Sequence, residues 1–236
     1  MNILAFDTCF DACSVCVAEK REGGVLELAS ARERFETGHA ERLLPMIDEV
    51  MAKAAVAFDD LNLIAVTVGP GTFTGTRIGV AAARALVLTT GLGVVGLSSL
   101  AVMADMAADE FGARPGGEDL AVAVDARRGE VYVQLFAPSG LTHKSQPMLL
   151  SVEDAARLGG EGPLLVIGSG GAAVADAGAR EGRRVTARLP DLLPDASALA
   201  QMAAHYAPGK TPPAPFYLRA PDAKPQDGKS IARSRR

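Results

Sequence analysis

Alternating apolar and polar positions at the start of the chain predict three β-strands. They lie at 2–7, 13–19 and 25–34, and short turns join them. Strands this close in sequence are expected to pair as an antiparallel meander. The pattern then changes to a helical period at 39–55, carried by Ala40, Leu43, Leu44, Ile47, Val50, Met51 and Ala54.

The remaining chain alternates between strand and helix patterns. In the first half, buried strands are predicted at 61–68 and 93–97, with helices at 76–90 and from Ser98 or Ser99 to about 111. In the second half, strands are predicted at 119–125, 130–136, 141–150 and 163–168, and helices at 151–158, 170–180 and 195–206. The two halves resemble each other in the order of their elements.

This repeated order predicts an α/β protein of two similar units. The Gly- and Pro-rich stretch 112–117 is the predicted boundary, so the domains are expected at 1–112 and 113–219. Whether the helix at 195–206 packs back on the first domain is left open. The polar, basic tail at 220–236 is expected to be disordered.

Composition narrows the possible functions. The chain has 236 residues and a formal net charge of −4, which excludes a protein that coats nucleic acid by charge alone. Aromatic residues make up 5% and tryptophan is absent, which disfavours a platform for stacking bases. The N-terminus lacks a secretory pattern and no apolar run reaches the length of a membrane span. A cytoplasmic protein without membrane contact is therefore expected.

Three cysteines allow two interpretations. Cys9, Cys13 and Cys16 have the C-x3-C-x2-C spacing of radical S-adenosylmethionine enzymes, in which three thiolates hold an iron–sulfur cluster. However, Cys13 and Cys16 fall on a predicted strand and are an odd number of residues apart, so their side chains point to opposite faces. Burial as small apolar residues is the favoured interpretation.

A glycine-rich loop precedes the helix at 76–90. Gly69, Gly71, Gly75 and Gly79 could let backbone amides converge on an anion at the start of the helix, with Thr72 in the same loop. The alternative is close packing, because Gly75, Gly79 and Ala82 or Ala83 form a stripe of small residues. Packing is favoured, since the loop lacks the Gly-Lys-Ser/Thr ending of a Walker A motif.

Candidate chemistry is sparse elsewhere. Asp7, at the end of the first strand, could position magnesium or water, or tie down the following turn. His39, His143 and His205 fit no metalloprotease or hydrolase motif, and a structural or solvent-exposed position is favoured over a catalytic role for each. The residues alone therefore give no convincing catalytic set and no metal site. Asp7, Gly69, Gly71 and Thr72 remain as weak candidates for binding a nucleotide.

Several segments, in order and together spanning about 2–219, resemble the TsaB (YeaZ) family. The most specific is the run from Val68 to Gly79, Val-Gly-Pro-Gly-Thr-Phe-Thr-Gly-Thr-Arg-Ile-Gly. The others are Ile3-Leu4-Ala5-Phe6-Asp7-Thr8, His39 with Leu43-Leu44-Pro45, Asp125-Ala126-Arg127-Arg128-Gly129-Glu130-Val131-Tyr132, and Tyr217-Leu218-Arg219.

The resemblance implies an acetate-kinase/Hsp70/actin-like (ASKHA) fold of two related α/β domains with mixed sheets. It also implies a non-catalytic subunit of the bacterial complex that makes threonylcarbamoyladenosine in tRNA. In that family the chain dimerises with a TsaD-like catalytic subunit through helices matching 39–55 and 76–90, and a TsaE-like ATPase joins them. ATP and metal are expected on these partners and no cofactor on this chain, which meets tRNA only within the complex.

Two departures qualify the resemblance. The TsaD-like subunit holds its metal with a His-x-x-x-His pair, and the corresponding positions here are Ser98 and Val102, which cannot replace two imidazoles. The cysteine trio stands where the family has small or hydroxyl residues. A stand-alone nucleotide-dependent phosphotransferase of the same fold, using Asp7 and the glycine loop, is the alternative function.

The implied docking face comprises one side of both helices. Leu43, Leu44, Ile47 and Met51 are expected to be exposed apolar knobs, and Gly75 and Gly79 to admit a partner helix. The full set is His39, Leu43, Leu44, Ile47, Met51, Gly75, Thr76, Ile78, Gly79, Ala82, Ala83 and Leu86. Such a face predicts a homodimer when the chain is alone. It also predicts that Gly79→Leu weakens the heterodimer without unfolding the monomer.

Overall fold

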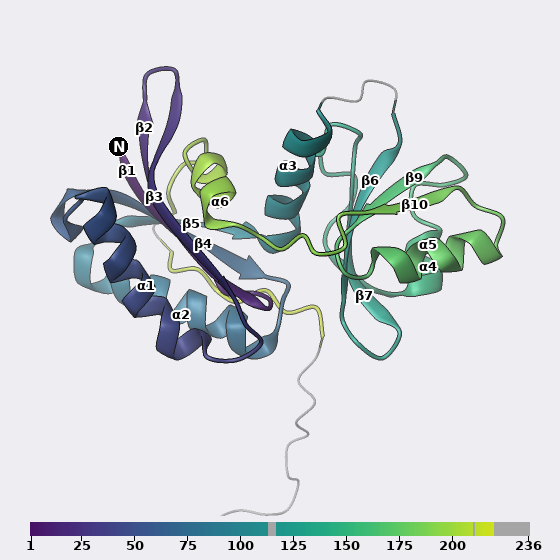
Figure 1. Cartoon of the computed structure of the whole chain (residues 1–236), viewed down its shortest axis with the longest axis horizontal. Helices are drawn as coiled ribbons and strands as arrows, with labels where there is room; N and C mark the ends of the chain where they lie inside the picture. Colours follow the sequence, from purple (N-terminus) through teal and green to yellow (C-terminus); the bar gives the residue numbers. More distant parts are fainter. Residues whose placement is uncertain (113–116, 210, 220–236) are drawn as a thin grey trace, which may run out of the picture.

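The chain forms two α/β units, each built on a five-stranded mixed sheet (Figure 1). The computed structural model describes residues 1–112, 117–209 and 211–219. The stretch 113–116, which falls in the predicted boundary, and the predicted tail 220–236 lie outside the described residues. Among the described helices, none combines the length and apolar composition needed to cross a bilayer.

The first sheet has the strand order β3-β2-β1-β4-β5. Its strands are β1 (Asn2–Asp7), β2 (Ala12–Arg21), β3 (Gly24–Arg34), β4 (Leu61–Gly69) and β5 (Gly93–Ser98). β1 pairs antiparallel with β2 and parallel with β4, so Leu4 lies opposite Val17 on one side and Ile64 on the other. β1 is central and buried, which explains its nearly continuous apolar run.

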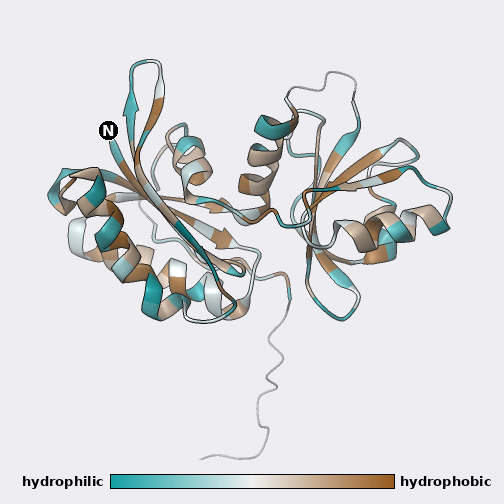
Figure 2. Ribbon diagram, in the orientation of Figure 1, coloured by the Kyte–Doolittle hydropathy of each residue, from teal (hydrophilic) through white to brown (hydrophobic). Residues whose placement is uncertain are grey.

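Helices cover both faces of this sheet. α1 (His39–Ala54) and α2 (Phe73–Thr90) pack on one face, where Leu43, Met46 and Ile47 meet strand residues in one apolar cluster. α6 (Ala196–Ala203) packs on the other face, with Leu199 among its buried residues. Figure 2 shows that polar residues gather on the outward side of α1. A short 3-10 helix (Phe58–Asp60) leads into β4.

The second sheet repeats the topology of the first, with the order β10-β9-β6-β7-β8. Its central strand β6 pairs antiparallel with β7 and parallel with β9, as β1 does with β2 and β4. Its elements are β6 (Asp119–Asp125), β7 (Glu130–Phe136), β8 (Met148–Ser151), α4 (Val152–Ala156), β9 (Leu164–Ile167), α5 (Gly171–Arg180) and β10 (Val185–Arg188). The repeat confirms the predicted two related α/β domains with mixed sheets.

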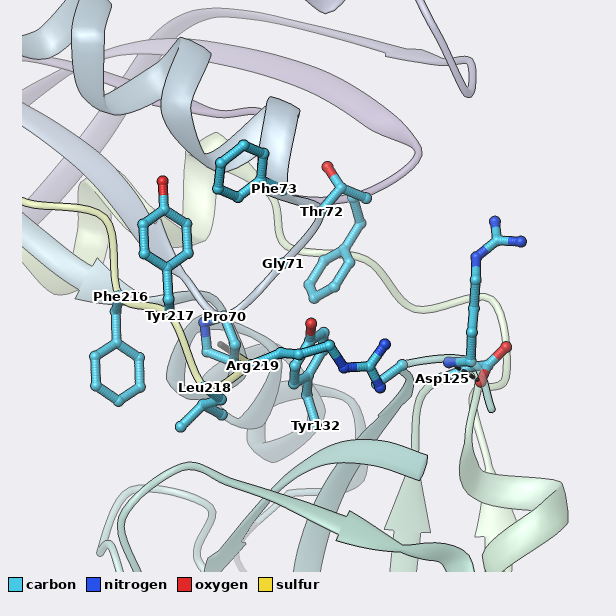
Figure 3. A pocket seen from close by; sticks show the side chains of 13 residues that line it. Pro70, Gly71, Thr72, Phe73, Asp125, Tyr132, Phe216, Tyr217, Leu218 and Arg219 are labelled. Carbon is cyan, nitrogen blue, oxygen red and sulfur yellow. Dashed lines mark hydrogen bonds between the residues drawn. The ribbon is translucent and has the colours of Figure 1, made fainter. Parts of the chain in front are cut away.

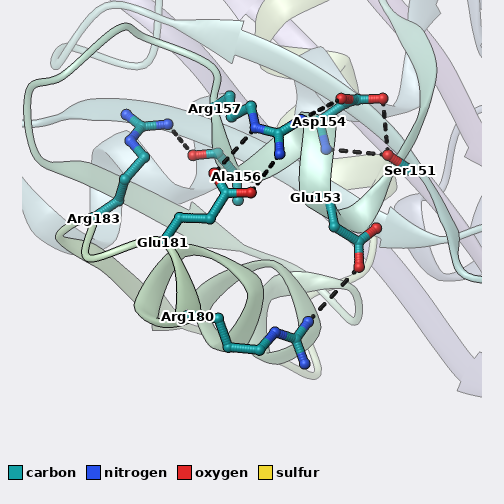
Figure 4. A network of polar contacts seen from close by, with 8 residues as sticks. All are labelled: Ser151, Glu153, Asp154, Ala156, Arg157, Arg180, Glu181 and Arg183. Atoms are coloured by element: carbon teal, nitrogen blue, oxygen red, sulfur yellow. Dashed lines mark hydrogen bonds and ion pairs between the residues drawn. The ribbon is translucent and has the colours of Figure 1, made fainter.

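Ion pairs and hydrogen bonds join α4 and the loop that follows it to the end of α5 and the residues beyond it (Figure 4). Arg183 donates to the carbonyl oxygens of Ala156 and Gly160, which lie at and just beyond the end of α4. Arg157 bridges Asp154 at 3.0 Å and Glu181 at 2.5 Å. Because Arg157 and its partners are largely exposed, these pairs contribute little each, and they mainly position the loops.

Three elements differ from the sequence prediction. β8 begins at Met148 rather than at 141, since the stretch before it forms turns and a single bridge between His143 and Phe136. The short edge strand β10 was not predicted. α2 begins at Phe73 rather than at 76, because the Thr72 hydroxyl accepts a hydrogen bond from the Gly75 amide at 3.1 Å and caps the helix.

Residues that follow the second sheet return to the first unit. Gly209 forms an isolated bridge with Val94 on β5, and the Phe216 amide donates to the Val68 carbonyl oxygen at 2.7 Å. These contacts, with the packing of α6, attach α6, Gly209 and Phe216 to the first sheet. The second unit therefore ends before α6 and not at 219, because α6 buries its apolar face on β1 and β4.

The two units also share a core. α3 (Ser99–Phe111) lies between them, and its Leu100 and Met103 pack in one cluster with Phe10 of the first unit and Leu120 and Phe136 of the second. Burial of these side chains holds the two sheets at a fixed separation.

The glycines of α2 allow it to approach β1 of its own chain. A Cβ added to Gly75 would lie 2.0 Å from the Thr8 carbonyl oxygen, and one added to Gly79 would lie 2.6 Å from the Thr8 hydroxyl. The Thr8 hydroxyl in turn donates to the Gly75 carbonyl oxygen at 2.7 Å. The expectation that Gly75 and Gly79 admit a partner helix is therefore corrected, because both are buried against Thr8.

This packing changes the expected effect of Gly79→Leu. We expect the variant to lower the free energy of unfolding by about 2 kcal/mol or more, because the added side chain must displace Thr8 from a tightly packed site. Chemical denaturation measures the effect. Ala81→Leu, on the exposed side of the same helix, is the matched control and should change stability little. A Gly79→Leu protein as stable as the wild type would contradict the prediction.

Candidate functional site

The glycine-rich loop before α2 directs its amides inward. The Thr72 amide donates to the Cys9 carbonyl oxygen at 2.7 Å, and the Thr76 amide donates to the Thr72 carbonyl oxygen at 3.0 Å. A Cβ on Gly71 would lie 2.4 Å from the Cys9 carbonyl oxygen, so Gly71 serves close packing. The sequence analysis had left Gly69, Gly71 and Thr72 as weak nucleotide-binding candidates. The Thr72 amide is engaged within the chain, and nucleotide binding at these three residues stays a prediction.

Asp7 lies buried beneath this loop. Its Oδ1 accepts hydrogen bonds from the Thr67 hydroxyl and, at 3.3 Å, from the Cys9 amide. Its Oδ2 has no hydrogen-bond partner among the described residues. Burial raises the pKa of Asp7 from its ordinary 3.8 to about 6, and the hydrogen bonds from Thr67 and Cys9 only partly offset this. Asp7 therefore ties down the turn after β1 and is not presented to a ligand.

The three cysteines are dispersed. Cys13 points into the core beneath α1, Cys16 into the core beneath α6, and Cys9 into the core shared with the second unit. All three are free and buried, and burial raises the pKa of Cys13 and of Cys16 to about 12 and raises that of Cys9 further. Thiols in three separate clusters cannot hold one iron–sulfur cluster, so that alternative is wrong.

Most of the predicted docking residues face the core. Leu43 and Ile47 are each 1% exposed and Met51 is 4% exposed, packed against the sheet. The expectation of exposed knobs is therefore corrected for all three. His39 is also buried, with its Nε2 at 2.8 Å from the Phe10 carbonyl oxygen. Thr76 and Ala83 are buried as well.

Some exposed positions on the two helices are nevertheless apolar. Leu44 is 56% exposed and Leu88 is 87% exposed, with the exposed Ala81 and Ala85 on α2. Three further predicted residues are half-buried beside them, namely Ile78, Ala82 and Leu86. We call this set of seven residues the outer helix strip. Four of its residues were predicted to dock a partner, namely Leu44, Ile78, Ala82 and Leu86. The other three, Ala81, Ala85 and Leu88, were not predicted, because helical periodicity alone does not distinguish exposed apolar residues from core residues.

A cleft of about 490 Å³ opens between the two units (Figure 3). We call it the interdomain cleft. Its walls come from four parts of the chain far apart in sequence: Phe10 and Pro70–Phe73 of the first unit, Asp125–Arg127 with Tyr132 of the second, and the segment Phe216–Arg219. The family-like segments around 70, 125 and 217 therefore meet here, although the sequence analysis assigned none of their aromatic residues to a site.

Aromatic and charged side chains line this cleft. The rings of Phe73 and Tyr217 lie 5.3 Å apart, tilted by 30°, and the Arg77 guanidinium lies 4.7 Å from the Phe73 ring centroid. Arg219 pairs with Glu130 at 2.5 Å, which joins the end of the chain to the second unit. Such a lining suits a planar or apolar ligand with a negative group.

The raised pKa of Asp7 makes a testable prediction. The folded protein favours the neutral carboxyl, so its contribution to stability is full below about pH 4 and is lost as the pH rises through about 6. We therefore expect Asp7→Asn to raise the free energy of unfolding by roughly 1–3 kcal/mol at pH 7.5 and to have little effect at pH 4. Urea denaturation at both values measures the difference. An equal effect at both would contradict a raised pKa.

Comparisons with known proteins agree with this architecture. A profile of the family described as TsaD, tRNA N6-adenosine threonylcarbamoyltransferase, matches residues 18–190. The tRNA threonylcarbamoyladenosine biosynthesis protein TsaB of Escherichia coli K12 is 37% identical over 132 residues, which are 56% of this chain and 53% of that protein. The chain thus spans about half the length of the curated TsaB relatives it matches.

Two further similarities cover nearly the whole chain. An uncharacterized protein of Mycobacterium tuberculosis H37Rv is 34% identical over 227 residues, 95% of this chain and 94% of that one. The solved structure of YeaZ from Pseudomonas aeruginosa superposes with a TM-score of 0.70 at 32% identity, covering 86% of this chain and 90% of that one. The predicted ASKHA-like fold is thereby confirmed, and the chain belongs to the TsaB (YeaZ) family.

Proposed function

We propose that this chain is a non-catalytic scaffold subunit in the biosynthesis of threonylcarbamoyladenosine in tRNA. In this proposal it binds and activates a TsaD-like catalytic subunit. Family membership supports the pathway, because the E. coli relative is named for tRNA threonylcarbamoyladenosine biosynthesis. The match to the TsaD family profile supports a partner of related fold.

The observation that carries the proposal is the outer helix strip. Leu88 and Leu44 expose apolar surface to water, and the exposed Ala81 and Ala85 of α2 are small enough for another helix to approach. Covering two leucines and their neighbours releases hydrophobic free energy that the isolated monomer does not gain. A helical partner of the same fold can supply such a cover on both α1 and α2.

The interior geometry supports a scaffold over an enzyme. The Thr72 and Thr76 amides are engaged within the chain, and Asp7 is buried, which disfavours the phosphotransferase alternative. Val102 is fully buried, and Ser98 offers a hydroxyl in place of an imidazole. Within the described residues, no three His, Cys, Asp or Glu side chains gather as metal ligands. We place ATP and metal on the partner subunits.

The remaining partners follow from the same proposal. A TsaE-like ATPase joins the heterodimer, and tRNA is met within the complex. In the absence of a partner, the outer helix strip packs against that of a second copy, and the chain forms a homodimer. The complex works in the cytoplasm, where three free thiols stay reduced.

Light scattering on the purified chain, alone and mixed with its own organism's TsaD-like subunit, tests the scaffold role. We expect the mass of a homodimer for the chain alone and of a heterodimer for the mixture, because one apolar strip serves both contacts. Two separate peaks in the mixture, with no complex at micromolar concentrations, would contradict the proposal.

The double variant Leu44→Glu/Leu88→Glu tests the surface itself. We expect it to weaken the heterodimer by at least about tenfold, since burying two carboxylates at an apolar contact is costly. Thermal unfolding should be nearly unchanged, because both side chains are exposed. Leu141→Glu, a substitution at a leucine 63% exposed in the second unit, is the matched control. Calorimetry that finds the same affinity for both variants would remove the outer helix strip as the docking face.

A further inference from the structure

The scarce aromatic residues of this chain are concentrated in one place. The sequence has eight phenylalanines, three tyrosines and no tryptophan. Five of these rings line the interdomain cleft: Phe10, Phe73, Tyr132, Phe216 and Tyr217. Three of the five are well exposed to solvent, Phe73 at 54%, Tyr217 at 44% and Phe216 at 40%. Exposed rings gathered at a concave surface indicate a ligand site more than a core.

The arrangement of the rings indicates a planar ligand. Phe73 and Tyr217 approach within 5.3 Å at a tilt of 30°, and Figure 3 shows the Tyr132 ring on the side of the second unit. The Arg77 guanidinium lies over the Phe73 ring, 4.7 Å from its centroid, in a cation–π contact that holds this ring in place. Bases stack on aromatic side chains in this way, and such stacking tolerates different base identities.

The charges at the cleft suit a phosphate. Arg127 and Arg219 line it, and Arg77 lies against the ring of Phe73, which also lines it. The Arg219 guanidinium forms an ion pair with Glu130, whereas the Arg127 side chain is exposed. The Arg127 backbone has a φ of 64°, and its amide donates a hydrogen bond to the Asp125 carboxylate at 2.8 Å. An arginine at such a position can bind a phosphate oxygen, a contact that does not depend on the base sequence.

The same cleft is poorly suited to a nucleoside triphosphate. In the neighbouring loop the Thr72 amide is engaged with Cys9 and the Gly75 and Thr76 amides with Thr72, so these three are not available to phosphates. Asp7, the residue that could have oriented magnesium, is buried and does not line the cleft. Aromatic rings with single arginines beside them suit a ligand of one base, which the rings can stack on, and one phosphate, which an arginine can contact.

We propose that the interdomain cleft binds an unpaired nucleotide of RNA. The base stacks against Phe73 and Tyr217, and Arg127 contacts the adjoining phosphate. This inference rests on the proposed function, which brings RNA to the complex, and it deepens that function by making the scaffold an RNA-binding subunit. It also revises the expectation from composition, since a low total of aromatic residues still forms a stacking site when half of them converge.

Fluorescence anisotropy with a labelled RNA hairpin that carries an unpaired loop tests the inference. The full chain and its mixture with the TsaD-like subunit are both titrated, and a fully paired duplex and labelled AMP are parallel probes. We expect Phe73→Ala/Tyr217→Ala to weaken hairpin binding by about tenfold or more. Phe58→Ala/Tyr206→Ala removes the same residue types at exposed positions outside the cleft and should leave binding unchanged.

The salt dependence separates phosphate contact from a change in folding. We expect Arg127→Gln to reduce the slope of log affinity against log salt by about 0.7, the loss of one phosphate contact on a single strand. Arg180→Gln, at a largely exposed arginine on α5, should leave the slope unchanged. A structural role for Arg127 would lower stability without moving this slope.

The other outcomes overturn the inference. Hairpin binding that is absent, that equals duplex binding, or that survives Phe73→Ala/Tyr217→Ala would show that the cleft does not hold an unpaired RNA nucleotide. Binding of AMP but not of the hairpin would assign the site to a free nucleotide instead. Light scattering on the same mixtures reports heterodimer formation independently, so a failed scaffold and a failed RNA site give different results.

Discussion

The close approach of α2 to the end of β1 is the contact on which the other features of the molecule depend. Gly75 and Gly79 bring the helix against Thr8, and the Thr8 hydroxyl bonds to the helix backbone. This contact fixes the rotation of α2 about its axis, because only the glycine side can lie so near the strand. Val80 and Ala83 are thereby directed into the core, and the outer helix strip is directed to solvent.

The same contact decides the chemistry of the loop. A glycine in this loop could let a phosphate approach the backbone, but the space beside Gly71 is filled by Cys9 and the space beside Gly75 by Thr8. A phosphate therefore cannot occupy those two positions. The loop then covers Asp7, which keeps one carboxylate oxygen unpaired in the described structure and has its pKa raised by burial. The protein tolerates this cost because the other carboxylate oxygen anchors both the turn and β4 through Thr67.

Sequence patterns predicted what local periodicity determines. The strand limits of β1, β6 and β7 and the start of α1 follow directly from alternation and helical spacing, and packing was the favoured use of the glycine loop. Periodicity does not say which element covers an apolar face, so Leu43 and Ile47 were assigned to a partner although their own sheet buries them. The interdomain cleft could not be derived either, since it joins residues near 10, 70, 130 and 217 that only the tertiary fold brings together.

α2 connects the two surfaces that the proposals concern. Phe73 is its first residue and reaches into the interdomain cleft, while Leu88 lies in its last turn, fifteen residues and about 22 Å along the axis. Because the glycine contact prevents the helix from rotating or sliding, a partner seated on the outer helix strip must lie at a fixed position relative to the cleft. A rigid helix with a docking face along its length and a stacking ring at its start can therefore align an RNA strand with a catalytic subunit. In this arrangement the scaffold contributes geometry, and the chemistry stays with the partner.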